Sequence, residues 1–373
     1  MSDGLTRIMR DMFPLTPLQE GMFYESTAQD RPWVNLEQIV VSLEGEALDG
    51  AAMQRAWQGV ADAHAVLRLV IEERAEDHPV QRLHAPAPIP FATLDWSGEA
   101  DPHQKLDDWL AQDRAAGIDP RTYPAFRVAL IRFAPDRGVL VWTLHHVLLD
   151  GRSLAEVLDE AFARYDRARA GDGEPDAALG ERDEVFAAHC RALASKDHAP
   201  GVAFFARHLA GYDGAHRIAE PSAAPGRKGR IEAFLSEAET AAFGDLAAAA
   251  EVAPSTVILA AWGIILARAT QSGDAVFGMT LAGRHLVEGA EQALGCFINT
   301  VPIRLRPGAA QTLGDVLAEA RADQIALRPH AHTPLSEIQR ASDVPGGRGL
   351  FDTIVMFDRA ALPAAMAGRG GAW

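Results

Sequence analysis

The first part of the chain alternates between helical and strand-like patterns of apolar residues. Thr16-Pro17-Leu18-Gln19 predicts a helix start, because Thr is a capping residue, Pro suits the first helical position and Gln follows three residues after the cap. A second helical pattern covers residues 50–67, and short strand patterns follow at 70–72 and 80–83. This mixture predicts an α/β fold of the α+β sandwich kind, with helices packed on sheets.

The strongest strand signal is a predicted hairpin over residues 125–144. An apolar run at 126–133 is followed by the turn-forming sequence Ala-Pro-Asp-Arg-Gly, and a nearly continuous apolar run returns at 139–144. Because the returning strand has no polar face, we predict that it lies inside a sheet that is covered on both sides.

A polar, glycine-containing stretch at residues 170–176 divides this region from the rest of the chain. We therefore expect two domains, residues 1–172 and residues 173–373. In the second domain the patterns predict helices over 182–209, 255–270 and 313–327 and strands at 275–281, 297–305 and 353–357. The helix over 255–270 is apolar nearly all round and is expected to be buried.

Composition excludes several classes of protein. The 373 residues carry a formal net charge of −16 without a dense basic run, which argues against a nucleic-acid partner. The longest apolar stretch, 257–267, is too short to cross a bilayer, and the N-terminus lacks the apolar core of a signal peptide. Cys190 and Cys296 have no metal-ligand spacing. We expect them to be buried thiols and the protein to be cytoplasmic, without a membrane partner.

The chemistry-bearing residues gather at one predicted strand–loop–helix corner. His145 and His146 follow the strand at 139–144, Asp150 and Gly151 come next, and Ser153-Leu-Ala-Glu reads as a capping box that starts a helix. A helix N-terminus collects free N–H groups that can stabilise a developing oxyanion. An imidazole can take or orient a proton near neutral pH. The corner therefore suits acyl transfer.

Local geometry suggests roles at this corner. Successive residues on an extended chain face opposite ways, so one histidine can point into a cleft while its neighbour points into the fold, and His146 is expected to assist the reaction as a base. Asp150 could orient the histidine as in a triad or form an ion pair. The ion pair is favoured, with Arg68 as the candidate partner, because no Ser or Cys nucleophile lies beside the histidine in sequence. Ser153 is expected to be a helix cap and not a nucleophile.

These residues resemble a known family. His-His-x-x-x-Asp-Gly-x-Ser at 145–153 is similar to the signature of the condensation domains of nonribosomal peptide synthetases, which belong to the chloramphenicol-acetyltransferase-like superfamily. Further segments resemble other motifs of that family in the expected order, at 13–22, 63–68, 203–211, 295–304 and 351–357. In the segment 63–68, Ala63 and Ala65 replace the Arg and Glu of the family motif.

The resemblance implies a fold and a reaction. The fold would be two chloramphenicol-acetyltransferase-like lobes in a V-shaped pseudodimer, with a tunnel for the phosphopantetheine arms of donor and acceptor carrier proteins. The reaction would be amide formation between a carrier-bound acyl or aminoacyl thioester and a carrier-bound aminoacyl group. His146 would be catalytic, the backbone N–H of Gly151 would face the substrate, and His145 and Asp150 would be structural. Partners would be carrier proteins and adjacent synthetase modules.

The resemblance also sets expectations for the second lobe. Condensation domains usually continue beyond the segment matched at 351–357, so this lobe is expected to be incomplete. Asn299 and Thr300 lie inside an apolar strand and could make backbone contacts or line the tunnel. Trp33 could belong to the core or to the tunnel mouth. No third ligand accompanies His330 and His332, so no metal and no permanently bound cofactor are expected.

Three alternatives remain open from the sequence. An epimerase of the same superfamily would share the histidine motif, although the opening segment at 13–22 favours condensation. A free-standing acyltransferase could form esters or amides on a small alcohol or amine. A non-catalytic remnant could bind a carrier protein without turning over a substrate.

Overall fold

The chain divides into two compact units. The computed structural model describes residues 12–27, 31–45, 47–74, 78–171, 182–214, 218, 229, 231–346 and 348–357. Within this part, unit 1 comprises the residues up to Lys196 together with Arg284–Ile298, and unit 2 comprises Asp197–Gly283 and Asn299–Phe357. The expected boundary between residues 172 and 173 therefore differs from the observed division. Most of the expected junction at 170–176 lies outside the described residues.

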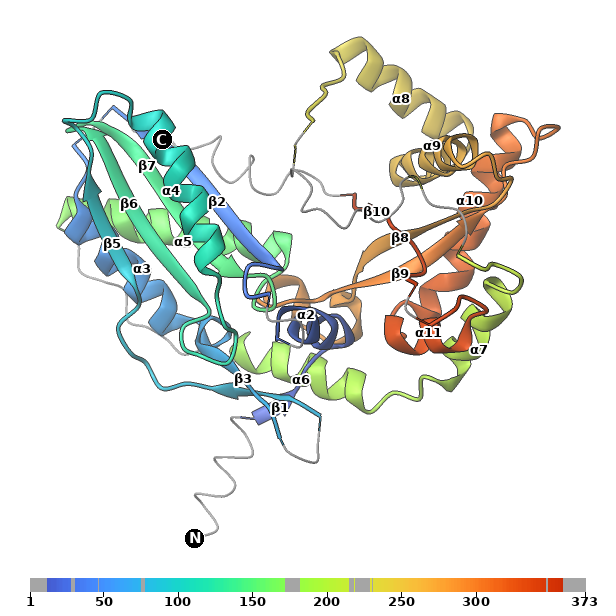
Figure 1. Ribbon diagram of the computed structural model, residues 1–373, viewed down its shortest axis with the longest axis horizontal. Helices are drawn as coiled ribbons and strands as arrows, with labels where there is room; N and C mark the ends of the chain where they lie inside the picture. The colour runs from blue at the N-terminus through green and yellow to red at the C-terminus, as the bar shows by residue number, and fades with distance from the viewer. Residues whose placement is uncertain are drawn as a thin grey trace, which may run out of the picture. The chain divides into compact units, whose positions relative to one another are not determined.

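The main sheet of unit 1 is built around the predicted hairpin (Figure 1). Its strand order is β2 (Leu36–Glu44), β7 (Arg137–His145), β6 (Phe126–Ala134) and β5 (Phe91–Asp95). Strands β2 and β6 both pair antiparallel with β7, and β5 runs parallel to β6. The predicted central position of the strand at 139–144 is confirmed, and all six of these residues are buried.

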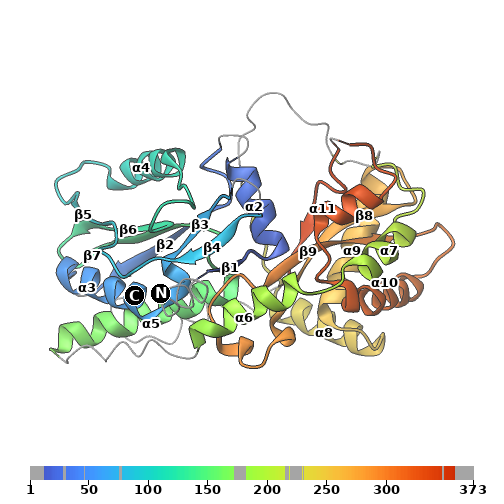
Figure 2. The same cartoon turned by 90° about the horizontal axis from the view of Figure 1, so that it is seen from below.

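Helices cover both faces of this sheet. Figure 2 shows α3 (Gly50–Ala63) and α5 (Gly151–Ala170) on one face and α4 (Pro102–Ala116) on the other. Side chains alternate along β7, so Trp142 packs toward α3, where its ring centroid lies 4.9 Å from that of Trp57. Val141 faces a separate apolar cluster on the side of α4. Strand β7 is thus fixed from both sides, which holds the loop that follows it.

A smaller sheet and two helices complete unit 1. The strand order is β1 (Met12–Pro14), β4 (Val80–Leu83) and β3 (Leu69–Glu72), with a 3-10 turn over Ala65–Arg68 before β3. Helix α2 (Pro17–Thr27) begins where the sequence predicts, because Thr16 and Gln19 exchange hydrogen bonds as a reciprocal cap. Helix α6 (Arg182–Ala194) and the 3-10 turns at Arg284–Leu286 and Ala290–Gln292 also belong to this unit.

Unit 2 has its own sheet and its own apolar core. The strand order is β10 (Ile354–Val355), β8 (Ala275–Ala282) and β9 (Ile298–Leu305), and β10 runs parallel to β8. The core includes Phe205, Phe277 and Leu305, which are fully buried. The helices are α7 (Ala199–His208), α8 (Glu237–Ala249), α9 (Pro254–Ala269), α10 (Leu313–Leu327) and α11 (Leu335–Ala341), and a 3-10 turn covers Arg328–His330.

Helix α9 differs from its expected environment. It was expected to be buried on all sides, but Ile265 is 51% exposed and Ile258 is 36% exposed. The opposite face is packed so closely that a Cβ added at Gly263 would lie 2.7 Å from Leu305 Cδ1. Among the described residues, no single helix is long and apolar enough to cross a bilayer. Helices α8 and α9 meet that criterion only as a pair, which is bent by 96°.

Candidate active site

The two histidines lie in the loop between β7 and α5. The N–H of His145 donates to Ala125 O at 2.9 Å, and the N–H of His146 donates to Asn35 O at 2.7 Å. The N–H of Leu148 then turns back to His145 O at 3.2 Å. The backbone is therefore tied to segments on both sides of β7 as it leaves the sheet, which gives His146 a defined direction.

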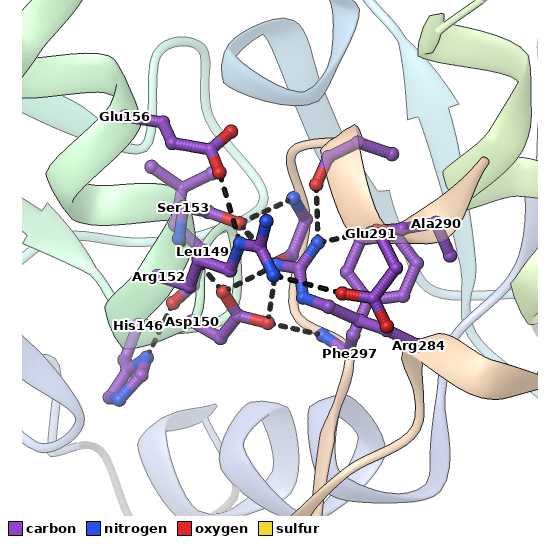
Figure 3. A network of polar contacts seen from close by, with 12 residues as sticks. His146, Leu149, Asp150, Arg152, Ser153, Glu156, Arg284, Ala290, Glu291 and Phe297 are labelled. Atoms are coloured by element: carbon purple, nitrogen blue, oxygen red, sulfur yellow. Dashed lines mark hydrogen bonds and ion pairs between the residues drawn. The ribbon is translucent and has the colours of Figure 1, made fainter. Parts of the chain in front are cut away.

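His146 keeps one ring nitrogen available. Its Nδ1 lies 2.7 Å from Leu149 O (Figure 3). Because a carbonyl oxygen can only accept, Nδ1 carries a proton, and in the neutral ring Nε2 keeps its lone pair. The side chain is 23% exposed, and Nε2 lies 3.9 Å from Glu37 Oε1, which is too long for a hydrogen bond. This arrangement suits a general base that takes a proton at Nε2.

His145 is held in a very different way. Its side chain is fully buried, its Nδ1 accepts from Val147 N at 3.2 Å, and its Nε2 lies 2.9 Å from Ser26 Oγ. Burial, and to a lesser extent the neighbouring His146, lowers the pKa of His145 to about 4. A neutral, buried ring with both nitrogens in hydrogen bonds stabilises the loop from the inside.

Asp150 is both the cap of α5 and half of a buried ion pair (Figure 3). Its Oδ1 accepts from Ser153 N at 2.9 Å and from Arg284 Nη2 at 2.8 Å. Its Oδ2 accepts from Phe297 N at 3.1 Å, and its own N–H donates to Gly295 O at 3.0 Å. The carboxylate therefore joins the histidine loop to the segment Arg284–Ile298.

Arg284 is the partner of Asp150, so the expected pairing with Arg68 is wrong. Arg284 is 5% exposed, and its Nη1 donates to Ala290 O at 2.7 Å and Ala293 O at 2.6 Å. Its guanidinium carbon lies 4.3 Å from the centroid of the Phe297 ring. Arg68 instead donates to His84 O at 3.0 Å, because it lies at the end of a 3-10 turn beside β4.

Ser153 does not cap the helix as expected. Helix α5 begins at Gly151, and the carboxylate of Asp150 accepts the backbone N–H that a capping residue would satisfy. The Ser153 hydroxyl instead donates to Gly295 O at 3.0 Å and accepts from Gly295 N at 3.1 Å and Arg284 Nη2 at 2.9 Å. The expected capping box fails because an acidic residue three positions earlier, in the preceding loop, takes the same role.

Gly295 and Gln19 also support the loop, although the sequence predicted only a helix-capping role for Gln19 and no structural role for Gly295. Gly295 has a φ of 155°, and a Cβ there would lie 2.4 Å from the ring of Phe186, so a side chain would not fit. Gln19 is fully buried and donates from Nε2 to Val147 O at 2.8 Å. The opening motif of the sequence contains Gln19 and could have indicated its importance. For Arg284 the sequence offers a weaker signal, a charged residue in apolar surroundings near the end of a strand.

The N-terminus of α5 lies directly beside the histidine loop. Gly151 and Arg152 are its first residues, and their N–H groups donate to no acceptor in the described part of the chain. The side chain of Arg152 is occupied by Glu156 and Glu291, at 3.1 Å and 2.9 Å. Free N–H groups at a helix start can stabilise negative charge on a reacting oxygen.

Nothing in the described residues offers an acyl-accepting nucleophile to His146. Its Nε2 has no hydroxyl or thiol within hydrogen-bonding distance across the described ranges. Cys190 and Cys296 are unpaired and buried, as expected, and burial raises the pKa of both thiols. Direct attack by a bound nucleophile, assisted by His146, fits these facts better than a covalent enzyme intermediate.

The remaining candidate residues lie elsewhere. In unit 2, Asn299 Nδ2 donates to Ala331 O and Thr333 O at 2.8 and 3.1 Å, and Thr300 Oγ1 lies 3.2 Å from Thr280 Oγ1. These backbone and side-chain contacts account for both polar groups, and their place in a tunnel stays a prediction. Trp33, in unit 1, is 43% exposed. No cluster of metal-binding side chains is found among the residues described.

Comparisons with known proteins agree on one family. A model of the condensation domain matches residues 9–363. The chain is 32% identical over 91% of its length to chondramide synthase of Chondromyces crocatus, and 29% identical over 94% to bacitracin synthase 3 of Bacillus licheniformis. It spans only 9% and 6% of the lengths of these two relatives.

Solved structures show the same fold. The first condensation domain of the calcium-dependent antibiotic synthetase, in complex with a substrate analogue, aligns with a TM-score of 0.75 at 20% identity. That alignment covers 92% of this chain and 80% of the other. A starter condensation domain of rhizomide synthetase, in complex with C8-CoA and Leu-SNAC, aligns with a TM-score of 0.76 at 23% identity, covering 94% and 79%.

Proposed function

Because the chain belongs to the condensation-domain family, we propose that it forms amide bonds in nonribosomal peptide synthesis. The donor would be a carrier-bound acyl or aminoacyl thioester, and the acceptor would be the amine of a carrier-bound aminoacyl group. The proposal depends on the orientation of the His146 ring, in which Nδ1 is hydrogen-bonded and Nε2 is available. Its Nδ1–H is fixed by Leu149 O, so Nε2 of the neutral ring presents a lone pair. The loop of His146 leads into the N-terminus of α5, whose first two N–H groups donate to no acceptor among the described residues.

The chemistry follows from these two features. The acceptor nitrogen attacks the thioester carbonyl, and the carbonyl oxygen gains negative charge that the N–H of Gly151 can stabilise. Nε2 of His146 takes the proton that the nitrogen loses as the C–N bond forms. The C–S bond then breaks, and the proton passes to the departing sulfur. General-base help contributes about 10²–10⁴ in rate, and the positioning of two tethered reactants can contribute more.

The proposal also includes the partners of the chain and its cellular location. Donor and acceptor carrier proteins would bring their substrates on phosphopantetheine arms, which act as tethers and not as a resident cofactor. The relatives named above are synthetases far longer than this chain, which supports adjacent synthetase modules as partners. A cytoplasmic location fits two buried, unpaired cysteines.

The experiment is a single-turnover assay with the donor on one carrier protein and the acceptor on another. Intact-protein mass would follow movement of the donor acyl group onto the acceptor carrier. Omission of the acceptor amine is the matched control, because it leaves hydrolysis as the only loss of donor. The proposal expects a mass gain on the acceptor carrier equal to the donor acyl group. A folded protein that yields only hydrolysis would contradict it.

The same samples separate the alternatives. An epimerase would exchange the α-hydrogen of a carrier-bound aminoacyl group, so incubation in D₂O would add deuterium without any acyl transfer. A free-standing acyltransferase would accept a soluble amine or alcohol as readily as a carrier-bound one. A binding remnant would retain the carrier protein and transfer nothing. The family match and the free Nε2 of His146 favour transfer between carriers.

A further inference from the structure

One carboxylate lies next to the free nitrogen of His146 and has no role in the proposed steps of amide formation. Glu37 lies on β2 opposite Leu144 of β7, two residues before His146. His146 lies just beyond the end of β7, and the Glu37 carboxylate approaches its ring from the neighbouring strand. The Glu37 side chain is 45% exposed, and its Oε1 lies 3.9 Å from His146 Nε2.

Glu37 is available for a ligand, whereas the other carboxylate of the site is not. Both oxygens of Asp150 are occupied by Ser153, Arg284 and Phe297. Across the described ranges, the only polar contact of the Glu37 side chain is the 3.9 Å approach to His146. Its strand neighbour Gln38 is neutral, and Gln38 Nε2 donates to Asp113 Oδ2 at 2.8 Å.

The spacing of the two groups fits a single nitrogen atom. Hydrogen bonds between nitrogen and oxygen span about 2.7–3.2 Å, so a gap of 3.9 Å is too long for direct contact. One amine nitrogen can lie within hydrogen-bonding distance of both Oε1 and Nε2 at this separation. An α-amino group has a reference pKa of about 7.7–8.0 and is mostly protonated at pH 7. A carboxylate beside a basic nitrogen is a suitable binding site for such an ammonium.

We propose that Glu37 binds the α-ammonium of the acceptor and positions it against Nε2 of His146. This inference rests on the proposed amide-forming function and names the acceptor-recognition group of the same site. The bound ammonium loses one proton to Nε2, which releases it to solvent, and the neutral amine stays hydrogen-bonded to Glu37. The amine then attacks the thioester. Its second proton goes to Nε2 and finally to the departing thiolate, so one thiol and one solvent proton are produced.

The test compares a cationic acceptor with a neutral one. The substrates are a soluble aminoacyl-pantetheine thioester and its α-hydroxy analogue, each varied in concentration against a fixed carrier-bound donor. The variants are Glu37→Gln, which removes the charge and keeps the shape, and Glu37→Asp, which keeps the charge. Glu44→Gln is the matched control, because Glu44 is an exposed residue at the far end of the same strand.

Glu37→Gln should raise the apparent KM for the amine about tenfold, as expected for a lost hydrogen bond to a charged group. The KM for the hydroxy analogue should stay within about twofold, because that acceptor carries no charge for Glu37 to bind. Glu37→Asp should recover part of the loss, and Glu44→Gln should match the wild type. A thermal midpoint equal to that of the wild type would show that the variant is folded.

Two results would overturn the inference. If Glu37→Gln leaves both acceptors unchanged, Glu37 does not contact the substrate. If it slows both acceptors equally, Glu37 acts on His146 or on the fold and not on the ammonium. A wild type that transfers neither to these soluble acceptors nor to the carrier-bound acceptor of the single-turnover assay would overturn the proposed function itself, and that failure is recognised before any variant is made.

Discussion

Two buried arginines, one in each unit, are held by nearly the same set of contacts. Arg284 in unit 1 and Arg304 in unit 2 are 5% and 6% exposed. Nη1 of each donates to two main-chain carbonyls, and each forms an ion pair with an aspartate, Asp150 or Asp274. Each guanidinium also lies near an aromatic ring, at 4.3 Å from Phe297 and 5.8 Å from Tyr212.

The two ion pairs differ in the part of the structure that each aspartate belongs to. Asp150 caps α5 and comes four residues after His146, so its ion pair fixes the loop that presents Nε2. Asp274 precedes β8, and its partner Arg304 lies on β9, so that pair fixes the edge of a sheet. The same kind of ion pair therefore fixes the loop of the proposed base in unit 1 and a sheet edge in unit 2. Burial and ion pairing by themselves do not identify a functional residue.

The largest expected effects come from removing each aspartate. Asp150→Ala and Asp274→Ala each leave a buried arginine without its anion, which should lower the free energy of unfolding by about 3–5 kcal/mol. Denaturant unfolding of the full chain measures this loss. At a temperature where both variants remain folded, Asp150→Ala should also slow amide transfer, because the loop before α5 is released, and Asp274→Ala should transfer at the wild-type rate per folded molecule.

If both folded variants transfer at the wild-type rate, the contrast between the two ion pairs is wrong. That result would mean that the loop keeps His146 in place without its ion pair. Equal loss of transfer would instead mean that unit 2 is coupled to the chemistry as directly as the cap of α5. A fully stable Asp150→Ala variant that is as inactive as a variant without His146 would refute the structural role of Asp150.

The next largest effect is expected from acid, which should destabilise unit 1 more than unit 2. Burial lowers the pKa of His145 and His189 in unit 1 to about 4. Their unfolded forms bind protons below a pKa of about 6.5, so the stability of unit 1 should fall between about pH 6.5 and pH 4. His145 alone accounts for a loss on the order of 3 kcal/mol. Hydrogen exchange resolved by peptide, and corrected for intrinsic rates, measures this for each unit separately.

Unit 2 should change less over the same pH range. Burial lowers the pKa of His208 to about 4, but it raises the pKa of Asp323 to about 7. The raised carboxyl stabilises the folded form at low pH, and this contribution is lost as the pH rises through about 7. The two groups oppose each other, and Asp323 Oδ1 lies 3.4 Å from His208 Nδ1. Asp323→Asn should make the stability of unit 2 fall more steeply between about pH 6.5 and pH 4 than it does in the wild type. Unchanged exchange in that variant would contradict the explanation.

The smallest expected effect is that of Ser153→Ala. It removes the hydroxyl that contacts Arg284 and both polar atoms of the Gly295 backbone, and it should cost about 1–3 kcal/mol because those groups stay buried. Ser195→Ala removes an exposed hydroxyl that donates to Ala192 O, and it is the control. Equal unfolding midpoints for the two variants would show that the Ser153 contacts add nothing to the buried network.

Local sequence predicted the elements whose signals are strong. The hairpin of β6 and β7 has two long apolar runs around a turn, and α10 was expected over the residues it occupies, 313–327. Helix α4 was not predicted, because only Leu106 among its residues is buried and its periodicity is weak. Strand β5 was also missed, because no residue of this edge strand is fully buried.

The site was predictable only where its residues are neighbours in sequence. His145, His146, Asp150 and Gly151 share one loop, and the motif brings them together without knowledge of the fold. The pairing of Asp150 with Arg284 joins residues 134 positions apart, and nothing in the local sequence encodes it. The role of Glu37 likewise depends on the register that places it opposite Leu144. Tertiary pairing, and not residue type, decides these contacts.

The single-turnover rate of His146→Ala tests most directly whether the free Nε2 of His146 is the base. His78→Ala is the control, because the His78 side chain is 87% exposed. We predict a rate lower by about 10²–10⁴ for His146→Ala, with an unchanged unfolding midpoint and unchanged binding of the acceptor carrier, and no change for His78→Ala. A folded His146→Ala variant that forms the amide at the wild-type rate would show that the free Nε2 is not the base.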